Sequence, residues 1–213
     1  MAVKILYEDK WLCLCVKEVG ISSEDGGMPE LLKQQCGMKH YCVHRLDMAV
    51  GGIMVYARDK ACAGKLSALV LGREVEKEYL AVVQGRPETD SGIMRDLLFK
   101  DSCKNKSYVV RRMRNGVKEA ELEYELLEAN DNMSLLRIKL HTGRSHQIRV
   151  QFSSRSMPLV GDVKYGSNHK DCPIALWSHR LCFRHPMTKK TIDISENPIN
   201  TKPWNEFTGG QNG

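Results

Sequence analysis

The amino-acid sequence predicts an α+β fold, a single domain over residues 1–213 with a central, largely antiparallel or mixed β-sheet flanked by a few helices and loops. Short runs rich in β-branched and aromatic residues dominate the chain, in an order that hairpins can connect. Helical spacing of apolar residues is confined to a few stretches. No internal repeat or linker divides the 213 residues, a length typical of one domain.

The chain opens with strands. Residues 3–7 and 11–17 are two predicted strands joined by a polar turn at 8–10. After a flexible loop at 22–27, a short helix is predicted with Pro29 at its first position.

GGIMVYARD (51–59) is predicted to form a strand whose residues 53–57 run into the core, and residues 60–76 follow with helical spacing. The predicted apolar stripe of this helix consists of Ala61, Lys65, Leu66, Leu69 and Val70. The next predicted strand, KEYLAVVQG, is closed by Gly85.

The rest of the chain is β-rich, except for one change of period. Gly143 ends a strand, and residues 144–154 are predicted to form a helix. The predicted strands are 107–112, 118–129, 134–141, 174–186 and 189–195.

The formal net charge is +6, and the positive charge is concentrated in KNKSYVVRRMR (104–114) and HTGRSHQIR (141–149). Basic patches are usually solvated faces, so charge alone makes nucleic acid only one candidate partner. No run of 18 apolar residues suggests a membrane span, and the first residues lack the apolar core of a signal peptide. We therefore expect a cytoplasmic protein.

The eight cysteines include no CxxC pair, which argues against a zinc ribbon and favours reduced thiols. Five of them lie among apolar or alternating residues and are predicted to be small buried hydrophobes: Cys13, Cys15, Cys42, Cys103 and Cys182.

The segment HYCVHRLDMAVGG (40–52) gathers groups that could carry chemistry. His40 and His44 are spaced as zinc ligands on a helix would be, but no glutamate accompanies them, so a metal-dependent hydrolase is the weaker hypothesis. No phosphate-binding glycine motif and no nucleophile elbow occurs. Asp47, after Arg45 and before Gly51-Gly52, remains. Taken alone, it is better explained as an aspartate that closes a strand and pairs with a surface arginine; the alternative is a carboxylate used directly, with the glycines allowing a tight turn behind it.

Five ordered segments change how this aspartate is interpreted: HRLD (44–47), EKEYLAVVQG (76–85), HTGRSHQIRVQF (141–152), LVGDVKYG (159–166) and ALWSHRLCFRHPMT (175–188). In this order they resemble the signature segments of the RluA-type pseudouridine synthases, which isomerise uridines in large-subunit rRNA and in tRNA. The resemblance covers nearly the whole chain. HRLD alone is a weak motif, whereas the ordered set is strong.

The resemblance implies a role for each matching residue. Asp47 matches the catalytic aspartate, Tyr79 the tyrosine against the target base, and Arg149 the arginine that pairs with the catalytic carboxylate. Arg45 matches an arginine that contacts RNA around the extruded nucleotide. The residues of the basic segment expected to meet the RNA backbone are Arg144, His146 and Gln147.

The chemistry of this reaction agrees with those roles. Uridine isomerisation breaks the N1–C1′ bond and rejoins the base through C5, without redox change or water, so we expect no cofactor and no metal. A carboxylate can act as a nucleophile or as a base, a buried arginine can offset its desolvation, and an aromatic face can receive the unstacked base.

The sequence also departs from the family pattern. The usual Thr-Ser-Gly after HRLD is Val50-Gly51-Gly52, and the usual Lys-Pro-x-Gly is Lys17-Glu18-Val19-Gly20. We expect the catalytic domain alone, without the small N-terminal RNA-binding domain of many relatives, and a monomer. The alternative hypothesis is a catalytically silent RNA-binding or ribosome-assembly protein on the same scaffold.

Overall fold

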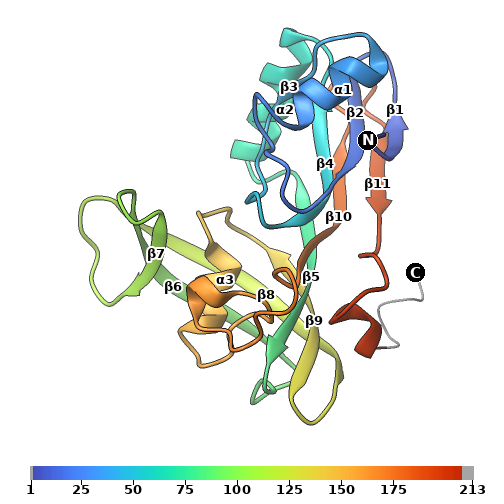
Figure 1. Cartoon of the computed structure of the whole chain (residues 1–213). Coiled ribbons are helices and arrows are strands. Elements are labelled where there is room, and N and C mark those ends of the chain that lie inside the picture. Colours follow the sequence, from blue (N-terminus) through green and yellow to red (C-terminus); the bar gives the residue numbers. More distant parts are fainter. Residues whose placement is uncertain (1, 208–213) are drawn as a thin grey trace. The chain divides into compact units, whose positions relative to one another are not determined.

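The computed structural model describes residues 2–207. The described residues form two compact units (Figure 1), of which the first comprises residues 2–77 and 177–198 and the second residues 78–176 and 199–207. The predicted α+β class is confirmed, because parallel and antiparallel strand pairs accompany three α-helices in the described residues. The single-domain organisation stays a prediction. No helix in the described part of the chain is long and apolar enough to cross a membrane.

The first unit contains a mixed sheet. Its strands are, in spatial order, β1 (Ile5–Glu8), β2 (Leu12–Lys17), β4 (Gly51–Ala57) and β10 (Leu176–Arg184), with β11 (Thr191–Ser195) on β10 and β3 (Tyr41–Cys42) on β4. The β4–β10 pair is parallel, and the other pairs are antiparallel. The predicted strands at 3–7 and 11–17 are therefore confirmed to within two residues.

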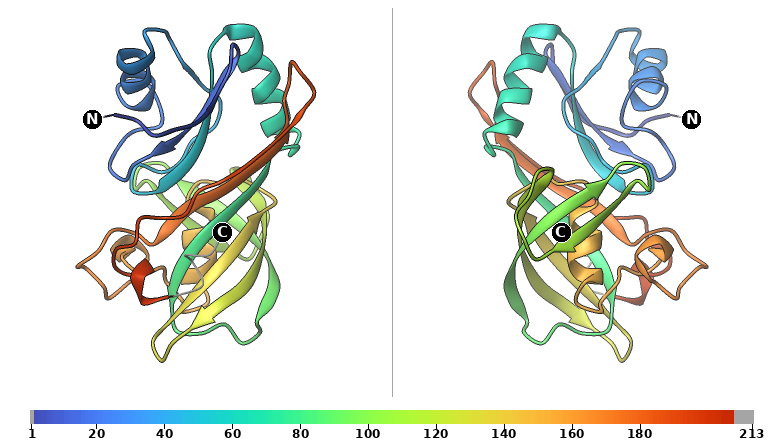
Figure 2. Two further views of the ribbon diagram at one scale, coloured as in Figure 1. Left: turned by 90° about the vertical axis from the view of Figure 1, so that its right-hand side faces the viewer. Right: turned by 90° about the vertical axis from the view of Figure 1, so that its left-hand side faces the viewer.

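Two helices, α1 (Met28–Cys36) and α2 (Lys60–Leu71), cover opposite faces of this sheet (Figure 2). Pro29 is the second residue of α1 and not the first as predicted, a position that also needs no backbone N–H donor. The carboxylate of Asp59 caps α2 by accepting a hydrogen bond from Cys62 N at 2.9 Å.

The predicted apolar stripe of α2 is only partly correct. Cys62 and Leu66 are buried, whereas Ala61 and Lys65 are exposed. Cys62 and Leu66 pack in one core cluster with Leu12 of β2 and Ile53 of β4. The buried face thus follows the i, i+4 row that starts at Cys62, one position later than predicted.

Gly51 and Gly52 are strand residues, in agreement with the strand predicted over 51–59, and they do not form the tight turn predicted behind Asp47. A Cβ at Gly51 would lie 2.5 Å from Cζ3 of Trp177, and a Cβ at Gly52 would lie 2.4 Å from the backbone N of Ser178. Gly52 also has a φ of +119°, which side chains rarely adopt. The glycine pair thus allows β4 to approach the Trp177–Ser178 backbone and the Trp177 ring closely.

The second unit is built on an antiparallel sheet. Its strands are, in spatial order, β5 (Glu76–Gln84), β9 (Met133–Leu140), β8 (Val117–Ala129), β6 (Ser91–Asp101) and β7 (Lys106–Val110). The sequence did not predict β6, since GIMRDLLFKD has neither clean alternation nor β-branched enrichment. In this order β7 is the edge strand.

Helix α3 (Gln147–Ser153) starts three residues later than predicted. His146 has a left-handed backbone with a φ of 53°, so the helix cannot extend back through it. All of its residues from Gln147 to Phe152 are buried, including the polar Arg149 and Gln151. Two short 3-10 turns, η1 (Val163–Tyr165) and η2 (Trp204–Glu206), complete the elements of this unit.

All eight cysteines are free thiols. Cys13 and Cys15 are buried as predicted, and Cys42 and Cys182 are partly buried. The prediction for Cys103 is wrong, because this residue is exposed in the turn between β6 and β7.

We expect Gly51→Ala to lower the free energy of unfolding by about 1–3 kcal/mol, because its methyl group would overlap the Trp177 ring. Urea unfolding followed by circular dichroism measures the effect. Trp177→Ala in the same chain should restore part of the loss. Gly64→Ala is the matched control, since a Cβ there meets nothing within 4 Å and helix propensity favours alanine. Equal effects of the two alanine variants would contradict the prediction.

Candidate active site and RNA-binding residues

Asp47 lies on a turn that backbone hydrogen bonds hold from several sides. Val50 N donates to Asp47 O at 2.9 Å, and Gly20 N donates to Met48 O at 2.8 Å. The buried hydroxyl of Ser23 accepts from Leu46 N at 3.1 Å and donates to Leu46 O at 2.9 Å. Asp47 itself is partly buried, so its carboxylate stands on a fixed backbone with partial access to solvent.

Lys17 is a charged neighbour of Asp47 that sequence reasoning missed. Its side chain is fully buried at the end of β2, and its ammonium group donates to Ile21 O at 2.9 Å, to Glu18 O at 3.1 Å and to Met48 O at 3.4 Å. Burial lowers the pKa of Lys17 to about 8, and the Asp47 carboxylate partly opposes this shift. In the sequence, the feature that points to a buried lysine is the position of Lys17 directly after the apolar run LCLCV.

His40 and His44 are framework residues in this structure. His40 Nδ1 lies 3.0 Å from Met38 O, and the lone pair of His44 Nε2 accepts a hydrogen bond from Val55 N at 3.2 Å. Burial lowers the pKa of His44 to about 3, so the ring is neutral. Because its Nε2 already accepts a hydrogen bond from the backbone of β4, His44 is unsuited to be the zinc ligand of the hydrolase hypothesis. The described residues include no group of three potential metal ligands.

Arg45 is exposed on the segment that leads to Asp47. Its guanidinium pairs with Glu24 at 2.9 Å, with 61% of one side chain and 56% of the other exposed. An ion pair this exposed contributes little to stability, so Arg45 can exchange Glu24 for another anion at small cost.

Tyr79 lies in the second unit, on β5 opposite Ile138 of β9. Its side chain is 7% exposed. The strand therefore holds the ring in a defined orientation within the sheet.

Arg149 is anchored by an aspartate that was not among the predicted site residues. Its Nε donates to Asp162 Oδ2 at 2.6 Å and its Nη2 to Asp162 Oδ1 at 2.8 Å, a bidentate pair of two buried side chains. The guanidinium also lies over the Tyr165 ring, 5.0 Å from the centroid. Both partners belong to the segment LVGDVKYG, in which the sequence pattern alone suggested no role for Asp162.

The basic turn before α3 is tied to the same cluster. His146 Nδ1 lies 2.9 Å from the Tyr165 hydroxyl. Arg144 is partly exposed, and its Nε donates to Glu119 O at 2.8 Å. Arg144, His146 and Arg149 therefore lie in one short segment of the second unit, and Tyr165 contacts both His146 and Arg149.

Gln147, predicted to meet RNA, is buried, and its amide is engaged inside the protein. Its Oε1 accepts from Thr142 Oγ1 at 2.8 Å and from Arg144 N at 3.0 Å, and its Nε2 donates to Glu121 O at 3.1 Å. In this structure Gln147 holds the turn that carries Arg144.

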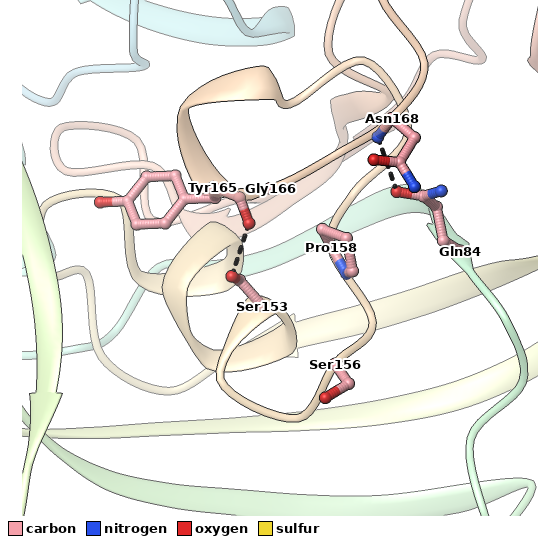
Figure 3. Close-up of a pocket in the computed structure, with 7 residues that line it drawn as sticks. All are labelled: Gln84, Ser153, Ser156, Pro158, Tyr165, Gly166 and Asn168. Atoms are coloured by element: carbon pink, nitrogen blue, oxygen red, sulfur yellow. Dashed lines mark hydrogen bonds between the residues drawn. The ribbon is translucent and has the colours of Figure 1, made fainter.

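A hollow of about 350 Å³ in the second unit lies beside the end of α3 (Figure 3). Ser153, Ser156, Gln84 and Asn168 are among its lining residues, and no acidic, basic or histidine side chain lines it. The Tyr165 ring points away from the other residues drawn there. Neither Tyr79 nor Arg149 lines the hollow, and no carboxylate lines it for the predicted reaction.

Comparison with known proteins identifies the family. The family described as RNA pseudouridylate synthase matches residues 29–154, a range that includes Asp47, Tyr79 and Arg149. The chain is 28% identical over 207 residues to a protein of Pasteurella multocida named ribosomal large subunit pseudouridine synthase C, covering 90% of this chain and 63% of that protein. It is 27% identical to the tRNA pseudouridine synthase C of the same organism, covering 91% of this chain and 90% of that protein.

The fold is similar to that of two solved human proteins. Human RNA Pseudouridylate Synthase Domain Containing 1 matches with a TM-score of 0.81 at 22% identity, over 95% of this chain and 86% of that chain. Human RNA Pseudouridylate Synthase Domain Containing 4 matches with a TM-score of 0.78 at 24% identity, over 92% of this chain and 89% of that chain. With the family match over more than half of its length, this chain belongs to the RNA pseudouridylate synthase family and is of the RluA type.

Proposed function

We propose that this protein is an RNA pseudouridine synthase that isomerises particular uridines of rRNA or tRNA. The observation that carries the proposal is Asp47, which stands on the anchored HRLD turn within a family match that also contains Tyr79 and Arg149. Relatives named for large-subunit rRNA and for tRNA support both classes of substrate. A cytoplasmic location and a monomeric state stay predictions from the sequence.

In the proposed reaction, the Asp47 carboxylate starts the cleavage of the N1–C1′ bond. It does so either by nucleophilic addition to the base or sugar, or by removing a ribose proton to give a glycal. The base then turns and rejoins the sugar through C5. In the nucleophilic course the bond to Asp47 breaks, and in the glycal course the ribose proton is returned. C5 loses its proton and N1 takes one up, so the product is an isomer of the substrate. Tyr79 receives the face of the base after it leaves the stack, a step that costs a few kcal/mol.

Arg149 is proposed to pair with Asp47, and its contact with Asp162 defines how it can do so. The bidentate contact uses two of the five guanidinium N–H donors and nearly neutralises the charge of Arg149. Arg149 would therefore act on Asp47 through directed N–H donors more than through net charge. Arg45, Arg144 and His146 are proposed to contact the RNA. Gln147 is proposed to act indirectly, by holding the turn.

Asp47→Asn should lower pseudouridine formation by roughly 10²–10⁴-fold while RNA binding persists, because the amide is neither a nucleophile nor a base. Mass spectrometry of rRNA and tRNA incubated with each protein measures conversion, and filter binding measures affinity. Asp131→Asn, in an exposed turn, is the matched control. An unchanged yield from Asp47→Asn would refute the mechanism. If the unaltered protein binds RNA but converts none of it, the catalytically silent alternative is supported.

Asp162→Asn should lower the free energy of unfolding by about 3–5 kcal/mol, because it removes the carboxylate charge that forms a buried ion pair with Arg149. Urea unfolding measures the loss. The double variant Arg149→Met, Asp162→Leu removes both charges and should recover much of the stability. Pseudouridine formation should stay low in the double variant if Arg149 acts in catalysis. Full activity in a stable double variant would show that Arg149 serves the fold alone.

A further inference from the structure

Nearly all of the net charge of the protein lies on one hairpin. Residues 100–119, here called the basic hairpin, comprise the end of β6, β7, the loop after β7 and the start of β8 (Figure 1). They carry seven Lys or Arg residues against Asp101 and Glu119, a net charge of +5, whereas the whole chain carries +6. The cations are Lys100, Lys104, Lys106, Arg111, Arg112, Arg114 and Lys118.

Other arginines of the second unit have carboxylate partners. Arg95 pairs with Glu121 at 2.7 Å, Arg137 with Glu125 at 3.0 Å, and Arg155 with Asp96 at 2.9 Å. Arg86 similarly pairs with Asp90 at 3.1 Å. The surface of this unit therefore usually compensates an arginine by placing an acidic side chain beside it.

The basic hairpin lacks this compensation. Within the described residues no Lys or Arg of the basic hairpin forms an ion pair, and the Asp101 carboxylate instead accepts from Lys104 N at 3.0 Å within the turn. Lys104, Arg111, Arg112 and Arg114 are exposed to solvent. Uncompensated, clustered cations repel one another, which favours the binding of a polyanion.

Apolar and aromatic groups lie among these cations. Tyr108 is 37% exposed and Met113 is 57% exposed. The Arg114 guanidinium lies 4.9 Å from the centroid of the Phe99 ring, and Lys106 Nζ lies 5.8 Å from that of Tyr108. Cations interleaved with exposed rings are typical of surfaces that follow a nucleic-acid strand.

The basic hairpin is fixed to the segment that carries Arg149. Ser107 N donates to the Tyr165 hydroxyl at 2.8 Å, and Ser107 Oγ donates to Ser145 O at 2.6 Å. Lys164 Nζ donates to Asn105 O at 2.6 Å. Since Arg149 lies over the same Tyr165 ring, the cations have a set position relative to Arg149.

We propose that the basic hairpin binds the phosphate backbone of the substrate RNA outside the nucleotide that reacts. This inference rests on the proposed function and extends it from the reacting uridine to the flanking strand. The contacts are to phosphates, so they set affinity and register and do not read base sequence.

The test compares two triple variants with the same loss of charge. Lys104→Gln, Arg111→Gln, Arg112→Gln removes three of the seven cations of the basic hairpin. Arg86→Gln, Arg95→Gln, Arg137→Gln removes three arginines of the same unit that already have carboxylate partners. Filter binding to transcribed, unmodified tRNA gives the affinity of each protein between about 50 and 200 mM salt. Thermal unfolding verifies that both variants are folded.

We expect the basic-hairpin variant to bind about 100-fold more weakly near 100 mM salt, and the slope of log K against log salt to fall by about 2, because each lost phosphate contact removes about 0.7 from that slope. The control should change far less. Equal losses in both variants, or an unchanged slope in the basic-hairpin variant, would overturn the proposal. Because binding is measured without turnover, a protein that forms no pseudouridine would refute the proposed function and leave the test of the basic hairpin intact.

Discussion

In the second unit, two opposite charges buried side by side connect the basic segment before α3 to the basic hairpin. Arg149 and Asp162 are nearly inaccessible to water, and their bidentate contact helps to offset the desolvation of both groups. Their contact joins α3 to the loop at 159–166, and Tyr165 of that loop extends the connection to β7 through Ser107. The segments GRSHQIR and GDVKYG, which are separated in sequence, are therefore in contact in the fold. Their relative position depends on the ion pair between Arg149 and Asp162.

The first unit holds its carboxylate differently. The turn that carries Asp47 is held mainly by backbone groups, with the Ser23 hydroxyl on one side and the Lys17 ammonium on the other. Lys17 donates to three backbone carbonyl groups, so the same ammonium group that lies near Asp47 also ties the surrounding loops together. Because these contacts fix the backbone on both sides of Asp47, the position of the residue does not depend on its own carboxylate alone. Such an arrangement suits a carboxylate whose oxygens have to react.

The sequence predicted the fold class, most strands and the functional segments, because strand alternation and ordered motifs are local properties. It failed where distant residues decide the outcome. The start of α3 depends on the left-handed backbone of His146, and the role of Gly51 depends on Trp177, which is 126 positions later. Asp162 and Lys17 could not be assigned from pattern alone, since their roles come from burial beside particular partners. Strand β6 was missed because its two faces do not differ clearly in polarity.

The position of β7 at the edge of its sheet has a consequence for the behaviour of the protein in solution. An edge strand presents unpaired N–H and C=O groups that could pair with the edge of another molecule. Here the strand is short and starts at Lys106, and Arg111 and Arg112 follow directly after it. Like charges would have to be brought together for two such edges to meet. The charge repulsion between these cations therefore opposes self-association through the sheet edge as long as no polyanion is bound to them.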